Sequence, residues 1–319
     1  MPRRDRAQQV IRLEYPATLG SDEFERAIAT LGSELPRTAR VEVDLTRTTF
    51  APLDVLVSSL YLYNELVSRG NDVALSWGDD QPTFGYADRM GFFNILDSGV
   101  DVWPTRPGRW SSLYTAHNRN NPNLLELTPL EPGNFRMATN ALDHLRERLA
   151  GNLESLPRSG EVVDNIWTFA AEAIGNIDEH SQTPVPGLVA AQRYNSPTRG
   201  PRLHLVIADG GLGIPETIRA GNPAGAADRT DVEVMLAAFK DGLSRRSTRG
   251  RGCGLTTCAR IAMAYKGNLR VRVGRTWARL ITKSARAGLS LGFFEDDAAP
   301  ISGTHISLDF YLDRLEELG

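Results

Sequence analysis

Glu172 and Asn176 are the two side chains whose types and spacing point most directly to chemistry. Residues four apart lie on the same face of a helix, one turn from each other. A carboxylate there can act as a general base that deprotonates a water molecule, and an amide oxygen is a ligand that Mg²⁺ accepts. The pair could place a base beside a bound magnesium ion, with Glu172 as the base and Asn176 as the magnesium ligand. The alternative is an ordinary helix surface that carries polar residues.

The two residues belong to a segment, residues 161–181, whose apolar residues recur with the period of a helix. Gly175 costs roughly 1 kcal/mol relative to alanine in a helix. This glycine indicates either that a ligand or another backbone segment approaches closely, or that the substitution is simply tolerated. One face of the predicted helix is apolar and can pack on a sheet, whereas the opposite face is polar. The apolar face holds Val163, Ile166, Ala170, Ala173, Ile174 and Ile177, and the polar face holds Asn165, Thr168, Glu172, Asn176 and Glu179, with His180 at its edge.

Two glycine-rich turns follow this helix. A predicted strand, residues 202–208, runs into the first turn, Asp209-Gly-Gly-Leu-Gly-Ile (209–214), and the second, Gly-Arg-Gly-Cys-Gly-Leu (250–255), enters a predicted helix. Glycine lets backbone pass close to a ligand where a Cβ would collide, and a helix N-terminus suits phosphate oxygens. The first turn lacks the GxGxxG spacing of a dinucleotide site. A simple tight turn remains the alternative.

Four elements in this order resemble the GHKL superfamily of ATP-binding domains, which includes the gyrase, Hsp90, histidine kinase and MutL types. They are ExxxN in the helix, DxGxGI, GxGxGL, and Gly303-Thr304 before a last strand. The resemblance implies a Bergerat-type α/β sandwich over residues 135–319, with ATP and Mg²⁺ as cofactors. It makes Glu172 the catalytic residue and Asp209 the acceptor of the adenine amino group. The implied cofactor-binding residues are Asn176 (also on the metal), Asp209, Gly211, Gly213, Ile214, Arg249, Gly250, Gly252, Gly254, Leu255 and Thr304.

The segment between the two turns, residues 215–249, is predicted to be a mobile lid with a short helix near residues 235–242. Its basic residues could reach phosphates as charge-assisted donors, or could belong to a solvated basic loop. They are Lys240, Arg245, Arg246 and Arg249. Cys253 is interpreted as a small residue that fills space in the turn, and not as a nucleophile.

Residues 8–100 alternate predicted strands and helices, which indicates a small α/β domain. The stretch VEVDLTRTTFAPLDVLVSSL, the following strand over residues 73–77 and a short helix over residues 86–96 resemble a STAS domain, the anti-sigma-factor-antagonist fold. Switchable members carry Asp-Ser or Asp-Thr where this chain has Ala51-Pro52-Leu53-Asp54, so the resemblance implies a docking or dimerising module. Another small α/β domain is the alternative. Residues 101–134 are interpreted as an irregular linker, followed by a helix over residues 137–156.

The composition is that of an ordinary globular protein of two domains, with 319 residues, 41% hydrophobic and 24% charged. A net charge of −3 argues against general nucleic-acid affinity, and no run of about 18 apolar residues predicts a membrane span. Two cysteines, Cys253 and Cys258, favour a cytoplasmic setting without a structural disulfide.

Three functions fit this sequence. The first is a slow ATPase whose lid closure signals to a protein partner. The second is a serine/threonine kinase of the anti-sigma type, which the string EAIGNIDEH resembles. The third is a nucleotide-gated interaction module without hydrolysis. A protein partner is expected, and a homodimer is one option.

Overall fold

A computed structural model describes residues 9–78, 81–109, 111, 114, 124–131, 133–154, 158–180, 185–196, 200–244, 253–282 and 289–312. The chain divides into two compact units, residues 1–117 with 298–301 and residues 118–297 with 302–319. Among the helices of these described ranges, none is long and apolar enough to cross a membrane.

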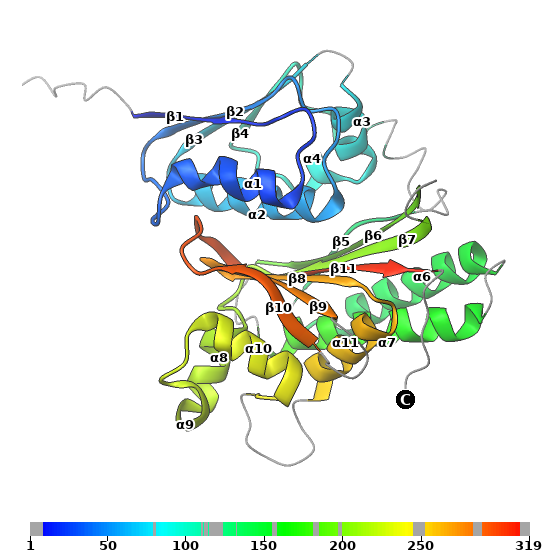
Figure 1. The fold of residues 1–319 in the computed structure, drawn as a ribbon. Coiled ribbons are helices and arrows are strands. Elements are labelled where there is room, and N and C mark those ends of the chain that lie inside the picture. Colours follow the sequence, from blue (N-terminus) through cyan, green and yellow to red (C-terminus); the bar gives the residue numbers. More distant parts are fainter. Residues whose placement is uncertain are drawn as a thin grey trace, which may run out of the picture. The chain divides into compact units, whose positions relative to one another are not determined.

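The first unit is built on a four-stranded parallel sheet in the order β1-β2-β3-β4. Alternate residues of β2 and β3 are buried, so one face of the sheet forms the core. The helices α1 and α2 lie side by side along this sheet (Figure 1). The strands are β1 (Val10–Glu14), β2 (Arg40–Leu45), β3 (Asp72–Trp77) and β4 (Val100–Trp103), and the helices are α1 (Ser21–Ile28), the 3₁₀ helix η1 (Ala29–Leu31), α2 (Leu53–Ser68), α3 (Pro82–Arg89) and α4 (Phe92–Ile95).

This unit confirms the predicted α/β alternation and adds details. Helix α2 ends before Gly70, whose φ of 83° is the left-handed conformation expected of a helix end. The helix expected through residues 86–96 is divided into α3 and α4, because Gly91 between them adopts a φ of 80°. Helix α1 was not predicted from the sequence. Its buried residues are only Phe24, Glu25 and Ile28, too few for a clear helical period.

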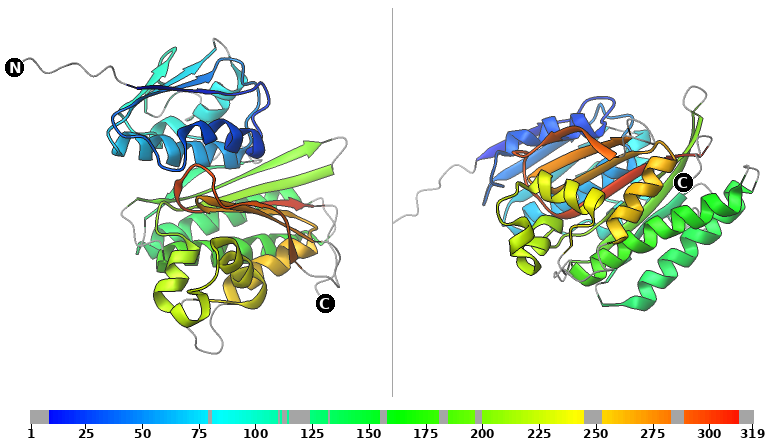
Figure 2. Two further views of the ribbon diagram at one scale, coloured as in Figure 1. Left: turned by 60° about the vertical axis from the view of Figure 1, so that its left-hand side comes forward. Right: turned by 60° about the horizontal axis from the view of Figure 1, so that its bottom comes forward.

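The second unit is a seven-stranded sheet in the order β10-β9-β8-β11-β7-β6-β5, with its helices on one face (Figure 1, Figure 2). The pairs β5–β6, β6–β7, β7–β11, β8–β9 and β9–β10 are antiparallel. This arrangement fits the expected α/β sandwich. The strands are β5 (Leu124–Leu130), β6 (Gly187–Ser196), β7 (Gly200–Ala208), β8 (Asn268–Gly274), β9 (Thr276–Thr282), β10 (Leu289–Glu295) and β11 (Ile301–Tyr311), and the helices are α6 (Phe135–Leu153), α7 (Ser159–His180), α8 (Ile214–Gly221), α9 (Pro223–Ala226), α10 (Asp231–Asp241) and α11 (Cys253–Ala264).

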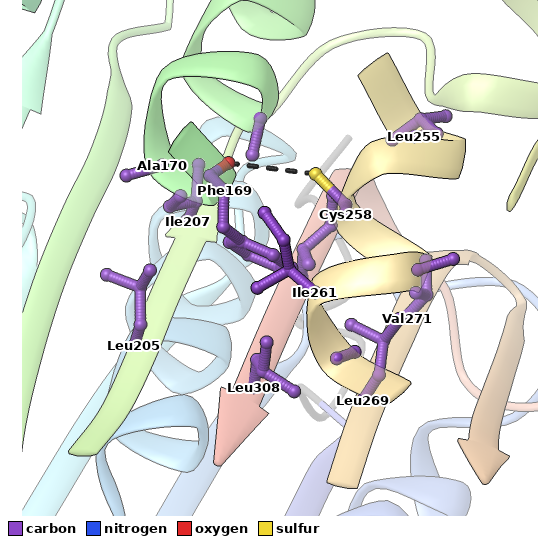
Figure 3. Packing of buried hydrophobic residues seen from close by; sticks show 14 of the residues in the cluster. Phe169, Ala170, Leu205, Ile207, Leu255, Cys258, Ile261, Leu269, Val271 and Leu308 are labelled. Atoms are coloured by element: carbon purple, nitrogen blue, oxygen red, sulfur yellow. Dashed lines mark hydrogen bonds between the residues drawn. The ribbon is translucent and has the colours of Figure 1, made fainter. Parts of the chain in front are cut away.

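One hydrophobic core joins the helices α6, α7, α10 and α11 to the sheet. Figure 3 shows its centre, where Phe169 of α7, Ile261 of α11 and Leu308 of β11 meet. The ring of Phe169 contacts that of Phe310 edge to face at 5.6 Å between centroids. Helix α7 is therefore fixed on the sheet along the apolar face that the sequence predicts.

The predicted linker over residues 101–134 is wrong at its start, where residues 101–103 belong to β4, and in its later part. Residues Leu124–Leu130 form β5, which pairs with β6 at one edge of the large sheet. Leu124, Leu125, Leu127 and Leu130 are buried there, so the segment contributes to the core. Pro129 obscured the strand, but an edge strand tolerates a residue without a backbone N–H.

The described part of the predicted lid consists of three helices, α8, α9 and α10. Helix α10 buries Val232, Val234, Met235 and Phe239 in the core of the unit. Arg219 at the end of α8 forms an ion pair of 2.6 Å with Asp231 at the start of α10. Residues 214–244 are thus packed rather than open, and residues 245–252 lie outside the described ranges. The mobility of this segment stays a prediction.

Candidate functional site

Helix α7 presents Glu172 and Asn176 together on its polar face. Glu172 is exposed and Asn176 is partly exposed, while Ala173 and Ile177 beside them are buried. The side-chain amide Nδ2 of Asn176 donates to the backbone carbonyl of Glu172 at 2.9 Å. This bond commits the amide nitrogen and leaves the amide oxygen to meet a ligand. The side chains of Glu179 and His180 lie outside what the structure describes.

The start of helix α11 lies against Glu172. A Cβ built on Gly254 would lie 2.6 Å from Oε2 of Glu172, so the glycine makes room for this carboxylate. Leu255, the next residue, is buried in the core, and the thiol of Cys258 donates to the carbonyl of Phe169 at 3.7 Å (Figure 3). These contacts hold the first turns of α11 beside the middle of α7. The first and third motifs therefore meet through Glu172 and Gly254.

Asp209 follows directly after β7 and is buried, with 6% of its surface exposed. Its Oδ1 accepts the backbone N–H of Gly211 at 2.7 Å. Burial raises the pKa of Asp209 to about 6, and hydrogen bonds from the backbone of Gly211 and Thr304 oppose the shift. A buried carboxylate with raised pKa is a frequent mark of a functional site.

The second and fourth motifs meet because β7 and β11 are antiparallel neighbours. The backbone N–H of Asp209 donates to the carbonyl of Thr304 at 2.9 Å. The hydroxyl of Thr304 accepts the N–H of Ile214, the first residue of α8, at 3.2 Å. Gly303 has a φ of 90°, and a Cβ there would overlap the carbonyl oxygen of Asp209. Asp209, Thr304 and the start of α8 thus form one connected group.

The glycines of the first turn have structural roles within the chain. Gly213 has a φ of 84°, and a Cβ there would overlap Cγ1 of Val273 in β8. Gly211 supplies the N–H that Asp209 accepts. These glycines are predicted from the sequence to allow close approach of a nucleotide, whereas Gly213 is already required by the backbone conformation and by Val273. Val273 was missed, since a valine in a strand carries no signal of its own.

Gly187 connects the two pairs of motifs. A Cβ built on this residue, the first of β6, would lie 2.9 Å from Cγ2 of Ile177 and 3.2 Å from the carbonyl oxygen of Ala208. Ile177 follows Asn176 in α7, and Ala208 precedes Asp209. The polar face of α7 and the end of β7 therefore lie at the same end of the sheet, next to the starts of α11 and β11.

Of the remaining predicted residues, only Lys240 lies within the described residues. Arg249, Gly250 and Gly252, as well as Arg245 and Arg246, lie outside the described residues. Lys240 is exposed near the end of α10. Their assignment to phosphates stays a prediction.

The substitution Gly303→Ala tests whether the second and fourth motifs depend on close backbone contact. We expect it to lower the free energy of unfolding by roughly 2–5 kcal/mol, because alanine is strained at positive φ and its methyl group overlaps Asp209. Gly274→Ala is the matched control, since Gly274 also has a positive φ, 55°, but open space around its Cβ among the described residues. Denaturant unfolding measures both. Equal losses in the two variants would contradict the assigned contact.

These residues fit a purine nucleotide bound with a divalent cation. Asp209 offers a buried acceptor, Asn176 offers a neutral oxygen that suits Mg²⁺, and the start of α11 offers backbone N–H groups. Glu172 stands one helical turn from Asn176, so a carboxylate and an amide oxygen share one surface.

Residues 161–312 match the family described as histidine kinase-, DNA gyrase B-, and HSP90-like ATPase. The match begins near the start of α7 and ends just after β11, so it contains all four motifs. No curated protein matches the chain. Over residues 161–312 the chain is thus similar to histidine kinase-, DNA gyrase B- and HSP90-like ATPase domains.

Proposed function

We propose that the domain binds ATP with Mg²⁺ and that Glu172 activates the nucleophile which attacks the γ-phosphate. The observation that supports this most is the position of Glu172, whose carboxylate lies beside the first turn of α11 and one turn from Asn176. Phosphate oxygens suit a helix N-terminus. A base placed there can reach a nucleophile next to the terminal phosphate.

In this proposal Asp209 and Thr304 hold the adenine end of the nucleotide. The Oδ1 atom of Asp209 already accepts from Gly211, so its Oδ2 atom accepts the amino group of the base. Since Asp209 is buried, this hydrogen bond is sheltered from water and strong. Asn176 supplies an oxygen to Mg²⁺, which when bound neutralises phosphate charge.

Glu172 acts on either of two nucleophiles. It can take the proton of a water molecule, which gives hydrolysis, or the proton of a protein hydroxyl, which gives phosphoryl transfer. Both reactions need the carboxylate of Glu172 in its ionised form. The exposed position of Glu172 leaves room for either acceptor.

Signalling to a protein partner is part of the proposal. The hydroxyl of Thr304 accepts the N–H of Ile214, and Ile214 begins the segment of α8, α9 and α10. A nucleotide held by Asp209 and Thr304 therefore influences the start of this segment. The segment closes over the nucleotide, and the protein partner recognises the closed conformation. A STAS-like identity for the first unit would suit docking or pairing.

The experiment is to measure Mg²⁺-dependent ATP binding and turnover by the full chain. We expect Asn176→Ala to weaken binding of Mg²⁺-ATP by about 10- to 100-fold, a typical loss for a charge-assisted contact. Asn165→Ala is the control, because Asn165 is the same residue type on α7 but bonds Tyr265. Calorimetry with and without Mg²⁺ measures the change. An Asn176→Ala variant that keeps its full Mg²⁺ dependence would contradict the assignment.

The products distinguish the three functions. Phosphate release without a protein acceptor indicates an ATPase. Label transfer from ATP to a serine or threonine of another protein indicates a kinase. Binding without turnover indicates a nucleotide-gated module. Wild type that binds no ATP would overturn the proposed function.

A further inference from the structure

The four-stranded sheet of the first unit has one face that the described helices leave open (Figure 1). Every second residue of β2 and β3 is buried against the core, and the residues between them are partly exposed on the opposite face. We call this opposite face the outer face. All-parallel sheets in proteins nearly always have both faces covered. The outer face is therefore a candidate interaction surface.

The half of the outer face near the amino ends of the strands is electrically balanced. Arg40 forms ion pairs with Glu42 at 3.0 Å and with Asp72 at 2.6 Å. Arg12 forms another ion pair with Glu42, at 3.1 Å. The arginines and the carboxylates neutralise each other there, so this half has no surplus charge that would attract a partner.

The other half, near the carboxyl ends of the strands, is acidic and holds an exposed indole ring. One row across the four strands, in register, consists of Glu14, Asp44, Ser76 and Trp103. Asp101 lies two residues before Trp103 in β4, so both side chains lie on the same face. Trp103 is 51% exposed. We call these five residues the acidic patch.

The acidic patch has a surplus of negative charge. Arg47 lies 3.9 Å from Glu14, and such a long contact between exposed groups contributes little. Hydrogen bonds from Thr46 hold the pKa of Asp44 below its usual value, so this carboxylate is ionised at neutral pH. Among the described residues, Asp101 has no ion-pair partner. The carboxylates of the patch are therefore largely available to a cationic partner.

We propose that the acidic patch binds a basic, extended segment of a partner protein. Neighbouring strands lie about 4.8 Å apart, so the row from Glu14 to Trp103 spans about 14 Å. Every second side chain of an extended peptide points to the same side, about 6.6 Å from the next, so three such side chains cover this length. Lysine or arginine at these positions reaches Glu14 and Asp44. The last of them lies over the ring of Trp103 and beside Asp101, where a cation–π contact and the carboxylate both favour it.

The charge of the acidic patch selects this occupant over others. A second copy of the chain would bring the same carboxylates face to face, and like charges across an interface are unfavourable. The phosphates of a nucleic acid would be repelled for the same reason. A basic protein segment neutralises the carboxylates and covers Trp103, and tryptophan is a residue type in which binding energy is often concentrated. The proposal concerns the first unit alone and goes beyond the nucleotide site.

The test measures the binding of a short fluorescent peptide of alternating lysine and serine to the full chain by anisotropy. Asp101→Lys should weaken this binding by about tenfold, because it replaces a negative charge beside Trp103 by a positive one. Glu34→Lys is the matched control, since it changes the net charge equally at an exposed residue between η1 and β2. This control should bind the peptide nearly as wild type does.

The indole ring is tested separately. Trp103→Ala should weaken binding of the lysine peptide by roughly 2- to 5-fold, the loss expected for an exposed cation–π contact. Phe50→Ala is its control, because Phe50 is an aromatic residue of the same unit, 42% exposed, that lies outside the acidic patch. All four variants change exposed side chains, so thermal unfolding should show folded proteins.

The outcomes separate the proposal from its alternatives. Equal affinities of wild type, Asp101→Lys and Glu34→Lys would overturn the inference, as would a wild type that binds a peptide of alternating glutamate and serine as well as the lysine peptide. Sedimentation of a wild-type dimer that Asp101→Lys converts to monomers would also overturn it, by assigning the face to a second copy. The peptide experiment contains no nucleotide, so its result is independent of whether the chain binds ATP.

Discussion

Glu172→Gln is expected to lower the rate of ATP turnover by about 10²–10⁴-fold, the contribution typical of a general base. Glutamine has nearly the same shape and keeps the helix, so the loss reflects the base and not the fold. Glu172 is exposed, which makes unfolding of the variant an implausible cause. Release of phosphate under saturating Mg²⁺-ATP measures the effect.

Binding must survive in this variant for the interpretation to hold. The removed charge repels phosphate, so the affinity for Mg²⁺-ATP should be equal or higher. Glu161→Gln controls for loss of one carboxylate from α7 and should keep wild-type turnover. A Glu172→Gln variant with more than half of the wild-type rate would assign the base to another residue.

Asp209→Asn is expected to weaken ATP binding and to stabilise the protein at neutral pH. Oδ1 of Asp209 accepts from Gly211, so in asparagine the other position becomes an NH₂ group that faces the amino group of the base. Loss of a charged acceptor should raise the Kd by roughly 10- to 100-fold. Calorimetry with ATP measures this change.

Asp209→Asn should stabilise the fold at neutral pH, although it weakens ATP binding, because of the pKa of Asp209. The folded state raises this pKa from 3.8 to about 6, so it binds the proton more tightly than the unfolded chain. The free energy of unfolding therefore falls as pH rises from about 4 to about 6, by on the order of 3 kcal/mol. An asparagine side chain carries no charge at any of these pH values, so this loss should disappear in Asp209→Asn.

Unfolding in denaturant at pH 4, 6 and 8 tests the sign. We expect the variant and wild type to differ least at pH 4 and the variant to be more stable at pH 8. Asp296→Asn is the control, because Asp296 is an exposed residue of the same unit. A variant that is less stable than wild type at pH 8 would show that the charge of Asp209 is well accommodated in the fold.

The sequence predicted those parts of the site whose residue types carry a chemical signal. The 3.6-residue period placed Glu172 and Asn176 on the polar face of α7, and the structure confirms that face. The strand before Asp209 and the helix after Gly254 are also confirmed as β7 and α11. These features are local, so a pattern of a few residues determines them.

Features that depend on distant residues were not predictable. Val273 and Gly187 shape the site only through neighbours far away in the chain. Strand β5 was hidden by Pro129 and by the polar residues before it, and its pairing with β6 decides its conformation. The fold is also needed to decide whether a glycine allows close approach of a ligand or is required by the backbone itself. Gly213 is such a case, because it has a positive φ and a Cβ there would overlap Val273.

The position of β11 has a consequence for biosynthesis. It is the last strand of the described chain, yet it lies between β8 and β7 in the interior of the sheet. Until residues 301–311 leave the ribosome, the sheet remains in two parts and Asp209 lacks Thr304. A nascent chain that stops before Ile301 should therefore be a client for chaperones and unable to retain ATP, even though Glu172, Asn176 and Asp209 have already been made.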